Sequence, residues 1–420
     1  MKKTGIFLFV LMLLFAACCG SNKEAGEADV GQGRLISDEN MKPELDPPPQ
    51  PEADERTQAM RMTDFSVRLF QECLQEGENT LISPLSVICA ISMAANGAEG
   101  NTLEQMEQAC GLSVEELNAY LNAFISQLPE EEAYKFTLAN SIWFKEDEGF
   151  QVYPEFLQKN EGYYKAQLYE VPFGPETVEQ VNAWVNQNTD GMIPGILDDM
   201  SEDDVMYLVN ALAFEAEWQK IYREDQIWDR EFTREDGTTV EAEFMYSEEG
   251  LYLEDEHAQG FLKYYEGGDY AFAALLPEEG MTVSDYVDSL TGEGLYETLD
   301  GVLNEKVMAA IPKFECAYNI EMSDALKAMG MTDAFDSQAA DFSGISDLPL
   351  YMDRVLHKSF LAVDEKGTRA GAATAVAMDA GAAMEEPHIV HLDRPFVYML
   401  IDCETNQPVF IGTMMDVSAK

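Results

Sequence analysis

Positively charged side chains are scarce in this 420-residue sequence. There are 26 Lys and Arg residues against 78 Asp and Glu residues, which gives a formal net charge of −52. Such a chain has no net positive field to neutralise phosphates, so nucleic acid and anionic lipid are excluded as expected partners. Seven cysteines and four histidines are too few for a disulfide-rich or multi-zinc architecture. Hydrophobic residues nonetheless make up 46% of the chain, which is enough to form a buried core.

The motifs of common catalytic and nucleotide-binding folds are also missing. The sequence contains no G-x-S-x-G, H-E-x-x-H, G-x-x-x-x-G-K-[ST], or G-x-G-x-x-G after a strand. His388 and His391 are three positions apart, but no cysteine or third histidine lies near them in the sequence. We therefore expect no metal and no cofactor. A hydrolase with an unrecognised Ser-His-Asp set stays as an alternative, and a pocket containing His257 or His388 would mark it.

The N-terminus has the pattern of a targeting segment. Lys2 and Lys3 precede an unbroken apolar run from Ile6 to Phe15, which is too short to span a bilayer and is typical of a signal peptide. The sequence then reads Phe-Ala-Ala-Cys18, similar to the bacterial lipobox, in which the cysteine is lipidated. We expect residues 1–17 to be a signal peptide outside the fold and Cys18 to carry the lipid. The protein is then secreted and lipid-anchored at the bacterial cell envelope, or extracellular.

The composition changes sharply after this segment. Between residues 19 and 57 there are ten acidic residues, four basic residues, no aromatic residue, and prolines at positions 43, 47, 48, 49 and 51. Such a stretch cannot bury enough apolar area to offset its ordering entropy, and its prolines favour an extended chain. Residues 18–57 are therefore predicted to be an acidic, proline-rich, disordered tether, and residues 58–420 to be the folded domain.

The folded domain is predicted to be of the α+β class, with helices more frequent early and strands more frequent late. Periodicity and capping residues predict helices at Ser86–Asn96, Thr102–Cys110 and Val114–Leu128. Alternating or continuous apolar runs predict strands at Phe136–Phe144, Val205–Phe214, Val307–Ile311, Phe396–Asp402 and Val409–Met415. The domain contains five cysteines without paired spacing, so one disulfide is left open.

The most unusual segment of the domain is a run of very small side chains between residues 365 and 384. It follows a strong strand pattern and precedes the last two strands, and a long segment of this kind is normally functional or disordered. A flexible linker and an alanine-rich helix are the plain alternatives. If the segment formed a strand, one face would be entirely small or apolar and would consist of Thr368, Ala370, Ala372, Thr374, Val376 and Met378. The opposite face would carry the charges of Arg369 and Asp379, so the segment can enter a core without burying a charge.

This segment resembles the hinge of the reactive-centre loop of inhibitory serpins. The resemblance covers nearly all of residues 62–417, through Asn79–Val87, Gly97–Met106, Val181–Ile193, Leu208–Trp218, Ile311–Glu315, Leu326–Met331, Ala340–Gly344, Glu365–Thr374 and Asp393–Phe396. It implies a serpin-like α+β fold with about nine helices, three β-sheets and an exposed reactive-centre loop at about residues 365–392. In this family the cleaved loop inserts as a new strand into the main sheet and releases stored strain.

The resemblance also assigns sites residue by residue. It implies a hinge formed by Glu365, Gly367, Thr368, Ala370, Ala372, Ala373 and Thr374. A polar cluster below the main sheet, the shutter, matches Ser83, Ser86, Asn210 and His357, and the breach, where the loop first enters, matches Trp218. The usual spacing from the hinge glutamate places the scissile bond at Gly381, whereas counting back from Phe396 lands nearer Met384. The candidates are therefore Met378, Ala380, Gly381, Ala382 and Met384.

The function implied by the resemblance is suicide inhibition of serine proteases by a monomer. No Lys or Arg occurs between Arg369 and Arg394, so a trypsin-like pocket finds no basic side chain, and an elastase-like or subtilisin-like target is expected. The net charge favours encounter with cationic proteases such as those released by host neutrophils. The alternative is a non-inhibitory serpin that acts as a binding or carrier protein.

Overall fold

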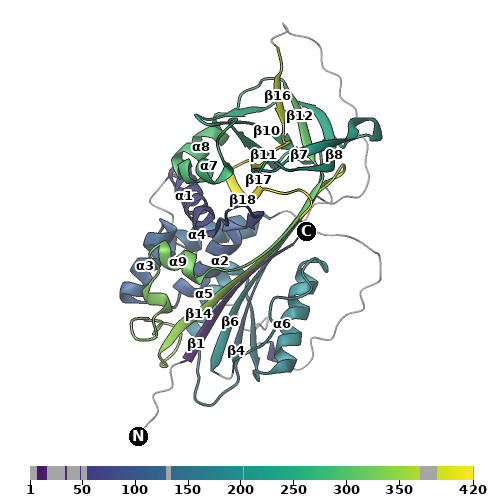
Figure 1. Cartoon of the computed structure of the whole chain (residues 1–420). Helices are drawn as coiled ribbons and strands as arrows, with labels where there is room; N and C mark the ends of the chain where they lie inside the picture. The colour runs from purple at the N-terminus through teal and green to yellow at the C-terminus, as the bar shows by residue number, and fades with distance from the viewer. Residues whose placement is uncertain are drawn as a thin grey trace.

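The computed structural model of the full chain describes residues 7–16, 34–35, 48, 54–128, 134–201, 203–368 and 386–419. The helices in these ranges are α1 (Glu55–Cys73), α2 (Pro84–Ala95), α3 (Gly100–Cys110), α4 (Val114–Gln127), α5 (Pro154–Tyr164), α6 (Pro175–Asn188), α7 (Val283–Ser289), α8 (Gly292–Asp300) and α9 (Ser323–Ala328). Helices α2 to α5 lie on one side of the main sheet and α6 lies on the other (Figure 1).

The main sheet has the strand order β13-β14-β1-β6-β4-β5-β2, and β15 pairs with β6 outside this path. Its strands are β1 (Phe7–Ala16), β2 (Arg34–Leu35), β4 (Tyr134–Lys145), β5 (Gln167–Val171), β6 (Asp204–Glu217), β13 (Phe314–Glu321), β14 (Leu350–Val363) and β15 (Gly367–Thr368). The pairs β4–β6 and β13–β14 are antiparallel. The long central strand β6 is almost wholly buried, as its continuous apolar sequence predicts.

Two smaller sheets complete the domain. The second sheet has the order β3-β18-β17-β11-β10-β9, and the third has the order β16-β12-β8-β7. Their strands are β3 (Thr80–Ile82), β7 (Ile227–Thr233), β8 (Thr239–Glu249), β9 (Tyr252–Glu254), β10 (Ala258–Tyr264), β11 (Tyr270–Pro277), β12 (Val307–Pro312), β16 (His388–His391), β17 (Phe396–Asp402) and β18 (Gln407–Met414). The predicted α+β class, with nine helices and three sheets in the described ranges, is confirmed.

The predicted helix ends are explained by local chemistry. Ser113 begins α4 with a capping box, in which its side chain accepts from the Glu116 N–H and the Glu116 side chain accepts from the Ser113 N–H. Gly111 ends α3 with φ 76°, a left-handed conformation that suits glycine. Helix α2 begins at Pro84 and all twelve of its residues are buried, so it forms part of the central core behind the main sheet.

In the structure of the full chain, part of the apolar N-terminal run is paired with the main sheet. In the full chain this run is β1, which lies between β6 and β14 and pairs in parallel with both (Figure 1). Two strands that are parted present unpaired N–H and C=O groups to each other, and an extended segment between them can pair with both. The assignment of residues 1–17 as a signal peptide remains a prediction.

The predicted tether also contributes to the fold at two points. Arg34 and Leu35 form β2, which pairs with Glu170 and Tyr169 of β5 at the sheet edge. Helix α1 begins at Glu55 with Asp54 as its N-cap, three residues before the expected boundary at 58. The pairing of β2 needs no particular sequence, because an edge strand offers free backbone groups to any extended segment that reaches it.

The cysteines of the domain do not pair among the described residues. Cys73, Cys89, Cys110 and Cys316 are buried free thiols, while Cys403 is partly buried and also free. The disulfide that the sequence left open is therefore not formed in this structure. None of the helices that the structure describes is long and apolar enough to cross a membrane.

Candidate functional site

The hinge begins with a tight turn at the end of β14. The N–H of Asp364 donates to the Gly367 carbonyl at 3.0 Å, and the Asp364 carboxylate accepts from the N–H groups of Lys366 and Gly367 at 2.8 and 3.2 Å. This aspartate turn reverses the chain. The next two residues form β15, in which Gly367 pairs with Glu217 and Thr368 pairs with Ala216 of β6. The start of the hinge is therefore already part of the main sheet.

Gly367 is required by the close approach of the two backbones. Its φ is +153°, and a Cβ atom at this position would lie 2.1 Å from the Ala216 carbonyl oxygen. A real side chain cannot occupy that space without separating β15 from β6. The next residue, Thr368, is fully buried. Glycine at position 367 therefore lets β15 lie close to β6, and the next residue of β15, Thr368, is buried.

The Trp218 side chain lies directly against the hinge backbone. Its indole Nε1–H donates to the Asp364 carbonyl at 2.9 Å, and its main-chain N–H donates to the Lys366 carbonyl at 2.8 Å. The ring is 2% exposed and stacks on Tyr265 with 4.6 Å between centroids. Trp218 thus fixes the turn from both its side chain and its backbone, and its assignment to the breach remains a prediction.

Several residues of this site escaped sequence reasoning. Lys313 pairs with Glu365 at 2.9 Å and with Glu243 at 3.4 Å. Lys263 is 2% exposed, and its ammonium lies 2.7 Å from Glu249 and over the rings of Trp218 and Tyr222 at 5.4 and 4.5 Å. Burial lowers the pKa of Lys263, and the Glu249 carboxylate opposes that shift. A lysine inside an otherwise apolar strand, as in Phe-Leu-Lys263-Tyr, was the available signal.

The four predicted shutter residues are brought close together, in two pairs. The Ser86 hydroxyl donates to Asn210 Oδ1 at 2.5 Å, and the Ser83 N–H donates to His357 Nε2 at 3.3 Å. Strand β1 runs between the pairs, with its residue 13 opposite both Asn210 and His357. Asn140, which sequence reasoning missed, accepts from the Asn210 side-chain amide at 2.8 Å.

The shutter histidine is neutral. His357 is fully buried, and burial lowers its pKa to about 3. Because Nε2 accepts a hydrogen bond from the Ser83 N–H, the ring proton resides on Nδ1, which has no hydrogen-bond partner among the residues that the structure describes. The imidazole thus serves as a buried hydrogen-bond acceptor and not as a proton carrier at neutral pH.

The remaining predicted site residues cannot be placed. Three groups of predicted residues lie outside the described part of the chain. They are the hinge residues Ala370, Ala372, Ala373 and Thr374, the scissile-bond candidates Met378, Ala380, Gly381, Ala382 and Met384, and the lipid-attachment residue Cys18. The chain is described again from Glu386. It then forms β16, which pairs in parallel with β12 at the edge of the third sheet.

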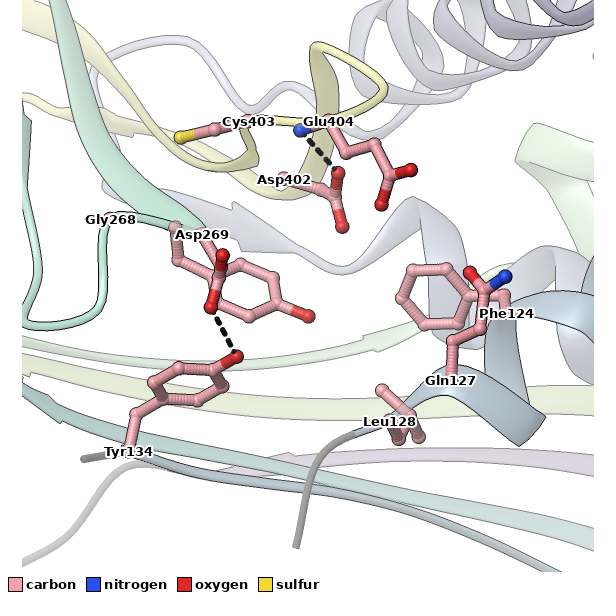
Figure 2. Close-up of a pocket in the computed structure, with 10 residues that line it drawn as sticks. Phe124, Gln127, Leu128, Tyr134, Gly268, Asp269, Asp402, Cys403 and Glu404 are labelled. Atoms are coloured by element: carbon pink, nitrogen blue, oxygen red, sulfur yellow. Dashed lines mark hydrogen bonds between the residues drawn. The ribbon is translucent and has the colours of Figure 1, made fainter. Parts of the chain in front are cut away.

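The cavities do not support the hydrolase alternative. One cavity of about 530 Å³ is lined by Tyr134, Asp269, Asp402, Cys403 and further residues, and in Figure 2 the Tyr134 hydroxyl points to the Asp269 carboxylate, 2.8 Å away. Burial and the neighbouring aspartates raise the pKa of the Cys403 thiol to about 12, so it is not a nucleophile at neutral pH. A second cavity of about 740 Å³ contains His391, but neither cavity is lined by His257 or His388.

A profile of the family described as "Serpin (serine protease inhibitor)" matches residues 60–417. The native-state structure of tengpin, a thermophilic serpin, is 42% identical, has a TM-score of 0.84, and covers 92% of this chain and 100% of its own. An uncharacterised serpin-like protein of Thermococcus kodakarensis is 29% identical over 99% of both chains. Human neuroserpin is 27% identical over 84% of this chain and 90% of its own.

The chain belongs to the serpin family. Serpins are in general inhibitors of serine proteases and not enzymes. The fold alone does not identify the activity, because human thyroxine-binding globulin, solved in complex with thyroxine, has a TM-score of 0.77 at 21% identity. Any activity of this chain therefore has to be argued from its own hinge and loop.

Proposed function

We propose that this chain is a suicide inhibitor of serine endopeptidases with elastase-like or subtilisin-like specificity. The observation that carries the proposal is the pairing of Gly367 and Thr368 with β6. The loop starts from this pair of residues in the main sheet and ends at β16 in the third sheet. Strand β15 is antiparallel to β6, so it already has the orientation of the strand that the loop would extend.

The proposed reaction begins as ordinary proteolysis. The protease serine attacks the carbonyl carbon at the scissile bond, the C–N bond breaks, and the serine proton leaves on the new amine. The N-terminal part of the loop stays attached to the protease as an ester. Once released from β16, this part extends β15 along β6, and the protease moves with it before water hydrolyses the ester.

The composition of the loop fits such an insertion. Thr368 is fully buried in the uncleaved protein. Every second residue after it is small or apolar, and the charges of Arg369 and Asp379 fall on the other face. Extension of β15 therefore adds backbone hydrogen bonds and buried apolar area without placing a charge in the core.

The absence of basic side chains in the loop supports the target class. No Lys or Arg lies between Arg369 and Arg394, so a trypsin-like pocket finds no partner for its buried carboxylate. Ala380, Gly381, Ala382 and the nearby methionines fit a shallow apolar pocket. The net charge of −52 accelerates encounter with a cationic protease such as a host neutrophil enzyme.

We further propose that the inhibitor works outside the cell, either lipid-anchored at the bacterial cell envelope through Cys18 or in extracellular form. The lipobox-like sequence supports the anchor, and the acidic, proline-rich composition of the stretch before α1 supports a tether between the anchor and the domain.

One observation favours a non-inhibitory binding protein as the second candidate. In the full chain, β1 occupies the position between β6 and β14 that an inserting loop requires. If this strand stayed in place throughout the life of the protein, the loop would be cleaved without trapping the protease.

The two candidates are separated by one experiment. The full chain and the chain that begins at Cys18, which keeps all of residues 60–417, are each incubated with pancreatic elastase, subtilisin and trypsin. An SDS-stable complex with elastase or subtilisin supports inhibition, and mass spectrometry of the released peptide locates the scissile bond. Cleavage outside residues 376–384, or faster complex formation with trypsin, contradicts the proposed specificity. Cleavage without any complex in either form favours the binding protein.

A further inference from the structure

The buried hydroxyl of Thr368 is hydrogen-bonded to the Tyr265 side chain. The Tyr265 hydroxyl lies 2.7 Å from Thr368 Oγ1, and both residues are almost completely buried. Tyr265 follows β10 in the second sheet, whereas Thr368 is the last described residue of the hinge. This hydrogen bond therefore joins the start of the loop to a different sheet.

The Tyr265 ring is held rigidly by its neighbours. It stacks on Trp218 with an interplanar angle of 11°, and it forms a T-shaped contact with Phe214 with 5.3 Å between ring centroids. Its main-chain N–H donates to the Tyr270 carbonyl at 3.0 Å. A ring packed on both sides in this way cannot rotate its hydroxyl away from Thr368 without disturbing the aromatic cluster.

We propose that Tyr265 is a positioning residue that holds Thr368 in the main sheet before any protease binds. The two-residue strand β15 is too short to be stable by its own ladder. The Tyr265 hydrogen bond and the glycine contact at Gly367 keep it paired, so that insertion starts from an existing end and not from a free loop. We call the Tyr265–Thr368 hydrogen bond the latch. The latch does not depend on the proposed inhibitory function, but its consequence for trapping does.

The consequence concerns the competition between loop insertion and ester hydrolysis. Ordering the hinge costs backbone entropy. When β15 is already paired with β6, insertion does not incur this initial cost. When the latch is lost, more cleaved loop is released before the protease is trapped. Tyr265 thus determines how many inhibitor molecules are consumed for each protease molecule that is captured.

The latch is tested first without a protease, by hydrogen–deuterium exchange of the full chain. Tyr265→Phe should accelerate exchange in the peptide covering residues 364–370 by about fivefold, the factor that corresponds to one neutral hydrogen bond of about 1 kcal/mol. Thr368→Val should have the same effect, and the double variant should add nothing further. Tyr264→Phe is the matched control, because its side chain points to the other face of the strand. Gly367→Ala, which clashes with the Ala216 carbonyl, gives the exchange of a fully released hinge.

The coupling is tested next, in the form of the chain that traps elastase. Tyr265→Phe should raise the stoichiometry of inhibition, whereas Tyr264→Phe should leave it unchanged. Unchanged exchange in Tyr265→Phe, or additive effects in the double variant, would overturn the latch. Faster exchange with unchanged stoichiometry would overturn its role in trapping. If no protease is trapped but the exchange results hold, the proposed inhibitory function fails while the latch stands.

Discussion

The Lys313 ammonium lies 2.9 Å from the Glu365 carboxylate and joins the start of β13 to the first residue of the hinge. Burial by itself would lower the pKa of Lys313, but its hydrogen bonds and charge interactions with Glu365 and Glu243 outweigh burial and raise it. The ion pair therefore links the start of β13 to the hinge, just before the two-residue strand β15.

Replacing this pair should loosen the hinge in a salt-dependent way. Because both side chains are partly exposed, we expect Glu365→Gln to lower the stability of the uncleaved protein by about 1 kcal/mol or less at low ionic strength. Thermal denaturation of the wild type and the variant at low and high salt measures this difference. A difference that does not shrink at high salt would show that the carboxylate acts through packing and not through charge.

The neutral shutter histidine should make the protein less stable in mild acid. The pKa of His357 is about 3 in the folded protein and about 6.5 when unfolded, so the unfolded chain binds a proton that the folded chain does not. Stability is therefore complete above pH 6.5 and falls as the pH decreases from 6.5 toward 3, by about 2 kcal/mol at pH 5. Urea denaturation at pH 7 and pH 5 measures the loss, and His357→Gln should reduce it. An equal loss in both proteins would assign the pH dependence to other groups.

A charge at the entry point should abolish trapping. Thr368 is a fully buried residue of the hinge, and Arg at this position would place an unpaired guanidinium in the main sheet at a cost of about several kcal/mol. In the chain that begins at Cys18, Thr368→Arg should convert the inhibitor into a substrate. Gel analysis with elastase measures the ratio of complex to cleaved product, and Thr368→Ser is the control that keeps a small hydroxyl. An unchanged ratio in Thr368→Arg would exclude loop insertion as the mechanism.

Cleavage of the loop should stabilise the domain. In the chain that begins at Cys18, an additional strand in the main sheet contributes ladder hydrogen bonds and buries apolar area, so the cleaved form should melt well above the intact form. Differential scanning calorimetry before and after cleavage by elastase measures the change. Equal melting temperatures would contradict a metastable native state and favour the binding-protein candidate.

The N-terminal strand and the inserted loop should exclude each other. Strand β1 covers β6 from Asp204 to Ala213, and β15 pairs with Ala216 and Glu217 on the same strand. Between them only residues 214 and 215 remain on this edge, which leaves no room for a longer loop strand. We therefore expect the chain that begins at Cys18 to trap elastase, and the full chain to be cleaved without trapping. Equal trapping by both forms would show that β1 leaves the sheet when the loop inserts.

The sequence by itself determined the class of the fold and the start of the loop. Continuous apolar runs predicted β6 and β12, and periodicity with capping residues predicted α3 and α4, because these signals are local to the chain. The small residues after Glu365 and their alternation likewise predicted a segment able to become a strand. Sequence order alone carried all of this information.

Only the tertiary structure decided which residues meet at the breach and in the shutter. Tyr265, Lys313 and Asn140 contact the hinge or the polar cluster across 103, 52 and 70 positions of sequence, to Thr368, Glu365 and Asn210 respectively. The structure also decided that residues 7–16 pair between β6 and β14. An apolar composition predicts that a segment prefers burial. The strand edges with which it pairs belong to β6 and β14, which come from distant parts of the chain. Local chemistry therefore fixes each element, and the packing of distant elements fixes the site.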